Sequence, residues 1–167
     1  MLFGRGGGGG RPSRGTVYDP GRERRAEVKA RDLLRAVAGE RAHAMYRELG
    51  FLVVRPRPAA SEAAYGYLIY PHRSIVAFDD RDGSLISEYC VGFPDHTDPE
   101  RGTRLPDADD VLAKWIALTG DERRLLTDAN MHLPGRQVDP SQARRDLRRL
   151  RAWEARERRE EQMGAAA

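Results

Sequence analysis

The chain has 167 residues, of which 33% are charged and 40% hydrophobic, and its formal net charge is +3. This length is enough for one domain of ordinary size with tails. The single cysteine, Cys90, allows no disulfide within the chain, which excludes a disulfide-stapled secreted scaffold. The longest apolar runs are far shorter than the ~20 residues that span a membrane, and no apolar signal segment follows Met1. We therefore expect a small soluble protein of the cytoplasm.

Charge is distributed unevenly along the chain. Residues 1–60 hold 13 basic and 6 acidic side chains, residues 61–140 hold 8 and 15, and residues 141–167 hold 8 and 5. Basic ends around an acidic middle suit an anionic partner held by the ends, or ends that fold back on the body. Arginine strongly outnumbers lysine. Arginine binds phosphate through two parallel N–H groups and is better suited to it than lysine. A GC-rich genome would produce the same excess of arginine.

The first part of the chain is predicted to be an arm followed by a helix. Residues 1–22 form a Gly/Arg-rich segment with too few apolar side chains to offset the conformational entropy lost on ordering. We therefore expect this segment to be disordered. From about Glu23 to Leu49 apolar residues recur with a helical period. Gly39 interrupts this helix, and Gly50 stands where a left-handed C-terminal cap is expected.

Residues 51–91 change to the pattern of a β-sheet. Strand candidates occupy residues 51–54, 65–70, 74–78 and 85–91, and Asp82-Gly83 is a strong turn signal between the last two. The pattern predicts an antiparallel meander of three to four strands.

Two short helices and a long one are predicted to follow. Carboxylates at Asp107, Asp109 and Asp110 favour a helix N-terminus, and Thr119 with Glu122 forms a candidate capping box for a second helix through about Met131. The long C-terminal helix is expected to begin at Asp139, Pro140 and Gln142, to dock through Trp153, and to pair Glu154 with Arg158 and Arg156 with Glu160 on its surface. The predicted fold class is therefore α+β, with one domain over residues 23–153 and an exposed charged helix end over 154–167.

Three segments of the chain are similar to small bacterial and phage proteins with no assigned activity. They read Ser87-Glu88-Tyr89-Cys90-Val91, Val111-Leu112-Ala113-Lys114-Trp115 and Gly120-Asp121-Glu122. The resemblance covers roughly residues 40–135 and implies nothing about mechanism.

Candidate metal ligands gather near one end of the predicted meander: His72, Cys90, Asp95, His96 and Asp98. Strand 85–91 should return to the edge where the turn at residue 72 lies, so these side chains could converge on zinc, which takes imidazole, thiolate and carboxylate ligands. A more specific hypothesis for the same residues is nucleophilic catalysis by a Cys90 thiolate, with His96 or His72 as its base. No CxxC or HExxH motif is present, so no cofactor is predicted, and a half-buried cysteine beside a solvated loop fits the same residues.

Arginines at both ends are the candidate nucleic-acid contacts. Those of the arm are Arg5, Arg11 and Arg14, and those of the last helix are Arg144, Arg145, Arg148 and Arg149. A flexible basic arm can follow phosphates without sequence preference. No helix-turn-helix, zinc finger or RNA-recognition core is visible, and a solvated helix face explains the second group equally.

We therefore predict a non-catalytic binding or accessory protein that acts partly through its basic ends. Its partner would be a protein, a second copy of the chain, or nucleic acid, and not a membrane. The alternative from another class is a metal-dependent enzyme or zinc-stabilised domain that uses His72, Cys90, Asp95 and His96.

Overall fold

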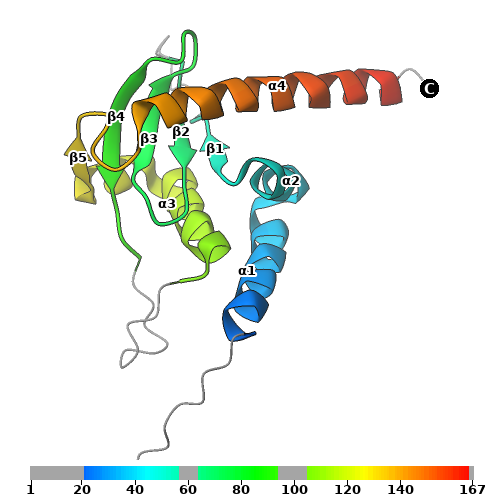
Figure 1. Ribbon diagram of the computed structural model, residues 1–167, viewed down its shortest axis with the longest axis horizontal. Helices are drawn as coiled ribbons and strands as arrows, with labels where there is room; N and C mark the ends of the chain where they lie inside the picture. Colours follow the sequence, from blue (N-terminus) through cyan, green and yellow to red (C-terminus); the bar gives the residue numbers. More distant parts are fainter. Residues whose placement is uncertain (1–20, 57–63, 94–104, 166–167) are drawn as a thin grey trace, which may run out of the picture.

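The computed structural model describes residues 21–56, 64–93 and 105–165, which form an α+β domain with four helices and one five-stranded antiparallel sheet (Figure 1). The predicted fold class is confirmed. The helices are α1 (Arg22–Ala38), α2 (Glu40–Leu49), α3 (Asp107–Asp128) and α4 (Pro140–Ala165). The strands are β1 (Leu52–Val54), β2 (Tyr65–Ile69), β3 (Ile75–Asp79), β4 (Leu85–Cys90) and β5 (Asn130–His132). Within these residues no helix is both long enough and apolar enough to cross a membrane.

Glycines end both N-terminal helices where the sequence predicts. Gly39 has φ 91°, and the chain changes direction there between α1 and α2. Gly50 has φ 83° and ψ 9°, and its N–H donates to the carbonyl oxygen of Tyr46. Left-handed backbone of this kind costs glycine little because it lacks a Cβ.

The sheet is a simple meander in the order β1-β2-β3-β4-β5. The first four strands agree with the predicted ranges to within a residue or two. Gly83, at φ 79°, supplies the turn between β3 and β4, and the N–H of Asp79 donates to the carbonyl oxygen of Ser84 across it, at 2.8 Å. The fifth strand was not predicted, because we expected residues up to about Met131 to be helical.

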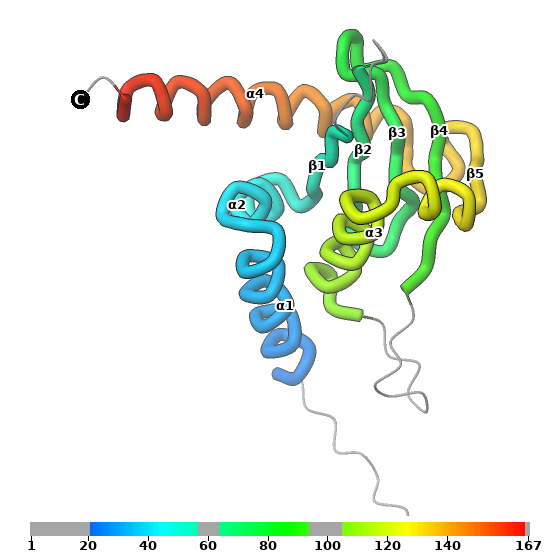
Figure 2. Tube along the Cα trace, turned by 180° about the vertical axis from the view of Figure 1, so that it is seen from behind, coloured from blue at the N-terminus to red at the C-terminus, as the bar shows by residue number. Residues whose placement is uncertain are grey.

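Helices cover both faces of the sheet. Figures 1 and 2, which show opposite sides, place α4 across one face and α3 across the other, with α1 beside α3. Side chains of β2 alternate accordingly: the Tyr67 hydroxyl reaches Glu122 on α3, and the Tyr70 hydroxyl just beyond the strand reaches Asp146 on α4. The core between these layers is built from fully buried apolar residues, among them Phe51, Leu68, Ile69, Ile75, Phe78, Val111 and Leu150.

The two short helices predicted after residue 106 both lie within α3, and they meet at a kink. Asp121 has non-helical angles, φ −155° and ψ 82°, inside α3. The predicted capping box at Thr119 is wrong, since the Thr119 hydroxyl donates back to the carbonyl oxygen of Trp115 at 2.7 Å. Asp121 itself caps the second half, because its Oδ1 accepts the N–H of Arg124 at 3.0 Å.

The C-terminal helix begins at the predicted residues, and its contacts with the rest of the domain continue beyond Trp153, where the prediction ended them. Asp139 Oδ1 accepts the N–H of Ser141 at 2.9 Å, and Trp153 is buried. The expected surface pairs beyond Trp153 are replaced by pairs with other elements, because α4 passes close to β1 and α2. Glu154 accepts from Arg55 at 2.7 Å, and Arg156 pairs with Glu48. Residues 158–165 are exposed and extend past α2 (Figure 1).

Candidate functional site

The outward side of α4 carries a group of arginines. Ala143, Leu147 and Leu150 of this helix are buried against the sheet. The helical period of 3.6 residues therefore places Arg144, Arg145 and Arg148 on the opposite side, where all three are exposed. We call these three residues the arginine face.

Among the residues that the structure describes, no acidic side chain pairs with the arginine face. Between Pro140 and Trp153 the helix has one carboxylate, Asp146, which is buried and accepts from the Tyr70 hydroxyl at 3.0 Å and from Arg149 at 2.8 Å. Within the described part of the chain, no hydrogen bond or ion pair involves the side chains of the arginine face. The positive charge of this surface is therefore available to a partner.

Arg149, the fourth predicted contact on this helix, is half-exposed, and its guanidinium makes contacts within the domain. Its guanidinium donates to Asp146 and, at 3.2 Å, to the carbonyl oxygen of Leu49, and it lies 5.9 Å from the centre of the Phe51 ring. It ties α4 to the end of α2. The predicted contacts Arg5, Arg11 and Arg14 lie outside the described residues.

His72, a predicted metal ligand, lies in the turn between β2 and β3 and contacts the N-terminus of α3. Its backbone N–H donates to Asp110 Oδ2 at 2.7 Å, and its Nε2 lies 3.0 Å from Asp107 Oδ1 without forming a hydrogen bond. The residue adopts φ 56°, which is costly for a side chain with a Cβ. These contacts with α3 hold the turn.

A buried lysine completes this turn. Lys114 is 1% exposed, and its ammonium donates to the carbonyl oxygens of Tyr70 and Arg73, each at 2.9 Å. It also pairs with Asp110 at 2.6 Å. Since a buried charge requires such partners, the cluster is structural, and no solvent reaches the ammonium as catalysis would need.

Cys90 lies at the same edge of the sheet as His72 but has different neighbours. Its sulfur is 3.2 Å from the Ser74 hydroxyl and accepts from the Gln137 amide at 2.6 Å. The other predicted ligands, Asp95, His96 and Asp98, lie outside the described residues. Over the ranges that are described, no three His, Cys, Asp or Glu side chains are grouped to hold a metal ion. A zinc site that includes Asp95 and His96 stays a prediction.

Glu88 holds the loop that leads into α4. Its carboxylate is 1% exposed and accepts backbone N–H groups from four consecutive residues, 135–138, at 2.7 to 3.4 Å. A carboxylate cradled by backbone donors fixes that loop firmly. The loop in turn sets where α4 begins on the sheet.

A cluster of tyrosines on the α3 side was missed in the sequence. The hydroxyls of Tyr65 and Tyr67 both donate to Glu122 Oε1, at 2.9 and 2.6 Å. Burial, and then the hydrogen bond to Glu122, raises the pKa of both phenols, so they remain donors. Beside them is an open hollow of about 460 Å³. Its lining residues are Tyr65, Tyr89, Glu122, Arg123, Leu126, Thr127 and Met131.

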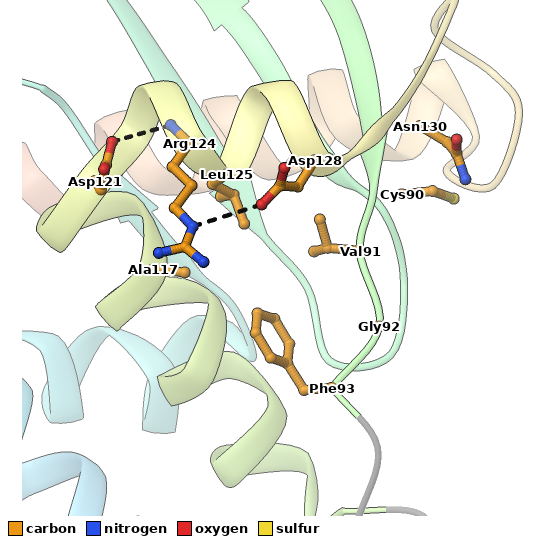
Figure 3. Close-up of a pocket in the computed structure, with 10 residues that line it drawn as sticks. All are labelled: Cys90, Val91, Gly92, Phe93, Ala117, Asp121, Arg124, Leu125, Asp128 and Asn130. Carbon is orange, nitrogen blue, oxygen red and sulfur yellow. Dashed lines mark hydrogen bonds and ion pairs between the residues drawn. The ribbon is translucent and has the colours of Figure 1, made fainter.

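A second hollow, of about 440 Å³, lies on the other side of the same half of α3. Figure 3 shows apolar side chains of Val91, Phe93 and Leu125 around it, with Cys90 pointing away. Arg124 at its rim is paired with Asp128 at 3.7 Å. The hollow therefore offers apolar surface without an unpaired reactive group.

No family model, no curated protein and no solved structure matches this chain.

Proposed function

We propose that the protein is a non-catalytic binding protein that holds the phosphate backbone of a nucleic acid on the arginine face of α4. The observation that carries the proposal is the exposure of Arg144, Arg145 and Arg148 on one side of α4, with no ion pair to any carboxylate of the described residues. Guanidinium groups match phosphate oxygens in geometry and charge. Neutralising phosphates also releases counterions, which supplies much of the affinity.

The composition of the face favours nucleic acid over a protein partner. The exposed residues of α4 next to these arginines include Ser141 and Ala152, and between Pro140 and Trp153 no exposed residue of the helix is aromatic or large and apolar. Protein interfaces usually have apolar or aromatic residues at their centre, whereas nucleic-acid interfaces are polar and strongly positive.

Binding is expected to be independent of sequence. The arginines lie along one helix face and are suited to contacts with phosphates, which position a protein without reading bases. Arg5, Arg11 and Arg14 would add phosphate contacts from the N-terminal segment, in keeping with the glycines around them.

The test compares two triple variants of the full chain by fluorescence anisotropy with labelled duplex DNA and labelled RNA. Replacing Arg144, Arg145 and Arg148 by alanine should weaken binding at least about tenfold, because a hydrogen bond to a charged group contributes ~1.5–3 kcal/mol. The matched control removes three exposed arginines from other surfaces, by Arg47→Ala, Arg123→Ala and Arg124→Ala.

Both variants change the net charge equally, so a general effect of charge would weaken binding by the same factor in each. If the arginine face holds the phosphates, the control should retain most of the affinity. Equal weakening by the two variants, or no binding of either nucleic acid by the unchanged protein, would reject the proposal. Selective binding of an acidic protein in place of both nucleic acids would assign the face to a protein partner.

A further inference from the structure

We infer that the hollow beside Glu122 is a binding site for a quaternary ammonium group. This inference does not depend on the proposed function, since the hollow lies on the α3 side of the sheet and the arginine face lies on α4. It rests on the rings of Tyr65 and Tyr89 and the carboxylate of Glu122, which line the hollow together, with Tyr67 packed behind them.

The three rings pack on one another at steep angles. Tyr65 and Tyr67 are 5.7 Å apart with an interplanar angle of 83°, and Tyr67 and Tyr89 are 6.4 Å apart with an angle of 69°. Tyr67 is buried, while Tyr65 and Tyr89 are partly exposed and line the hollow. The faces of aromatic rings attract cations, and quaternary ammonium groups are recognised in this way.

The rings can come this close because of the residues between them. Tyr67 pairs with Ala77 on the neighbouring strand, and Ala77 pairs with Ser87 on the next, so two small side chains share one row of the sheet. Tyr89 follows Ser87 by two residues and therefore lies on the same face.

Glu122 supplies a negative charge that no cationic side chain of the described residues neutralises. It is partly buried beside the rings, and among the described residues no arginine or lysine forms an ion pair with it. Arg123 also lines the hollow, but it is exposed and makes no such pair. A half-buried carboxylate next to neutral phenols favours the entry of a cation.

The hydrogen bonds at Glu122 indicate which cation fits. Its Oε1 already accepts two phenol protons, which occupy both of that oxygen's lone pairs. A guanidinium fork needs one acceptor on each oxygen, so this arrangement is unfavourable for arginine. A quaternary ammonium has no N–H to satisfy, and its methyl groups suit the apolar side chains of Leu126 and Met131.

The experiment titrates the full chain with choline and with 3,3-dimethyl-1-butanol, its uncharged counterpart of the same shape, by isothermal titration calorimetry. Choline should bind about tenfold more tightly or better, since cation–π contacts add ~0.5–2 kcal/mol for each ring. Equal affinities for choline and its uncharged counterpart would overturn the assignment.

Variants test the individual residues. Tyr89→Leu and Glu122→Gln should each weaken choline binding, by about two- to thirtyfold for the ring, whereas Tyr89→Phe should retain it. Arg123→Gln should strengthen binding because it removes a competing charge, while the neighbouring Arg124→Gln, which faces the other hollow, should change nothing. Circular dichroism confirms folding, and weakening by Tyr89→Phe as large as by Tyr89→Leu would count against the site.

A trimethyl-lysine peptide and its unmethylated counterpart identify the source of the ligand. Tighter binding of the methylated peptide than of choline assigns the site to a modified protein side chain. Tighter binding of choline assigns it to a small molecule. Both results support a quaternary ammonium site, and failure of both probes contradicts it.

Discussion

Replacing the buried lysine tests whether the turn between β2 and β3 depends on one ammonium group. Lys114→Met keeps the length of the side chain and removes the donor to two carbonyl oxygens, at 2.9 Å each, and to Asp110, at 2.6 Å. Asp110 would then keep the N–H of His72 but lose its buried counter-charge. Breaking a buried pair from one side costs about 3–5 kcal/mol, a large part of the ~5–15 kcal/mol by which a domain is stable.

The assay is urea denaturation followed by tryptophan fluorescence and circular dichroism. The matched control is Lys29→Met at the other lysine of the chain, which is exposed and should change the unfolding free energy by less than about 0.5 kcal/mol. The double variant Lys114→Met/Asp110→Asn should lose less than the sum of its parts, because the two residues are coupled. A Lys114→Met variant as stable as Lys29→Met would refute the structural role of this cluster.

Three further predictions concern the sheet. Gly66→Ala should destabilise the domain by about 1–3 kcal/mol, since its Cβ would lie 2.6 Å from the Phe78 ring; Gly66→Ala/Phe78→Leu should recover part of the loss in the same assay. Glu88→Gln should cost about 1–3 kcal/mol because an amide cannot accept all four backbone N–H groups, and hydrogen exchange of residues 135–138 should accelerate; unchanged exchange would contradict this. The hydrogen bonds from Arg81 lower the pKa of Asp79 to about 2. The stabilising contribution of Asp79 is therefore present above the carboxyl pKa of the unfolded chain and is lost as pH falls through about 2. In the Arg81→Gln variant, NMR titration should show the midpoint of Asp79 moving up towards ~3.9. An unmoved midpoint would rule out this pairing.

Local signals explain why much of the fold could be predicted. Gly39 and Gly50 act through their own backbone angles, and Asp139 acts on the next turn of the same helix, so each is visible within a few residues. The strand β5 is different. Its three residues have no alternating pattern. They form a strand because they pair with residues Glu88 to Cys90 of β4.

The candidate sites divide in the same way. The arginine face follows from the helical period of α4, so the sequence alone indicates it. The tyrosine site combines Tyr65 and Tyr67, which alternation places on one face, with Glu122, which lies 55 residues beyond Tyr67 and arrives only through packing of α3 on the sheet. No local sequence pattern could predict that Glu122 lies beside these tyrosines.

The most direct test of the central claim is the salt dependence of nucleic-acid binding. For duplex DNA, the logarithm of the association constant falls against the logarithm of salt concentration with a slope near −0.9 for each neutralised phosphate. Replacing Arg144, Arg145 and Arg148 by alanine should therefore make the slope less steep by about 2 to 3. A slope identical to that of the unchanged protein would show that α4 does not hold the phosphate backbone.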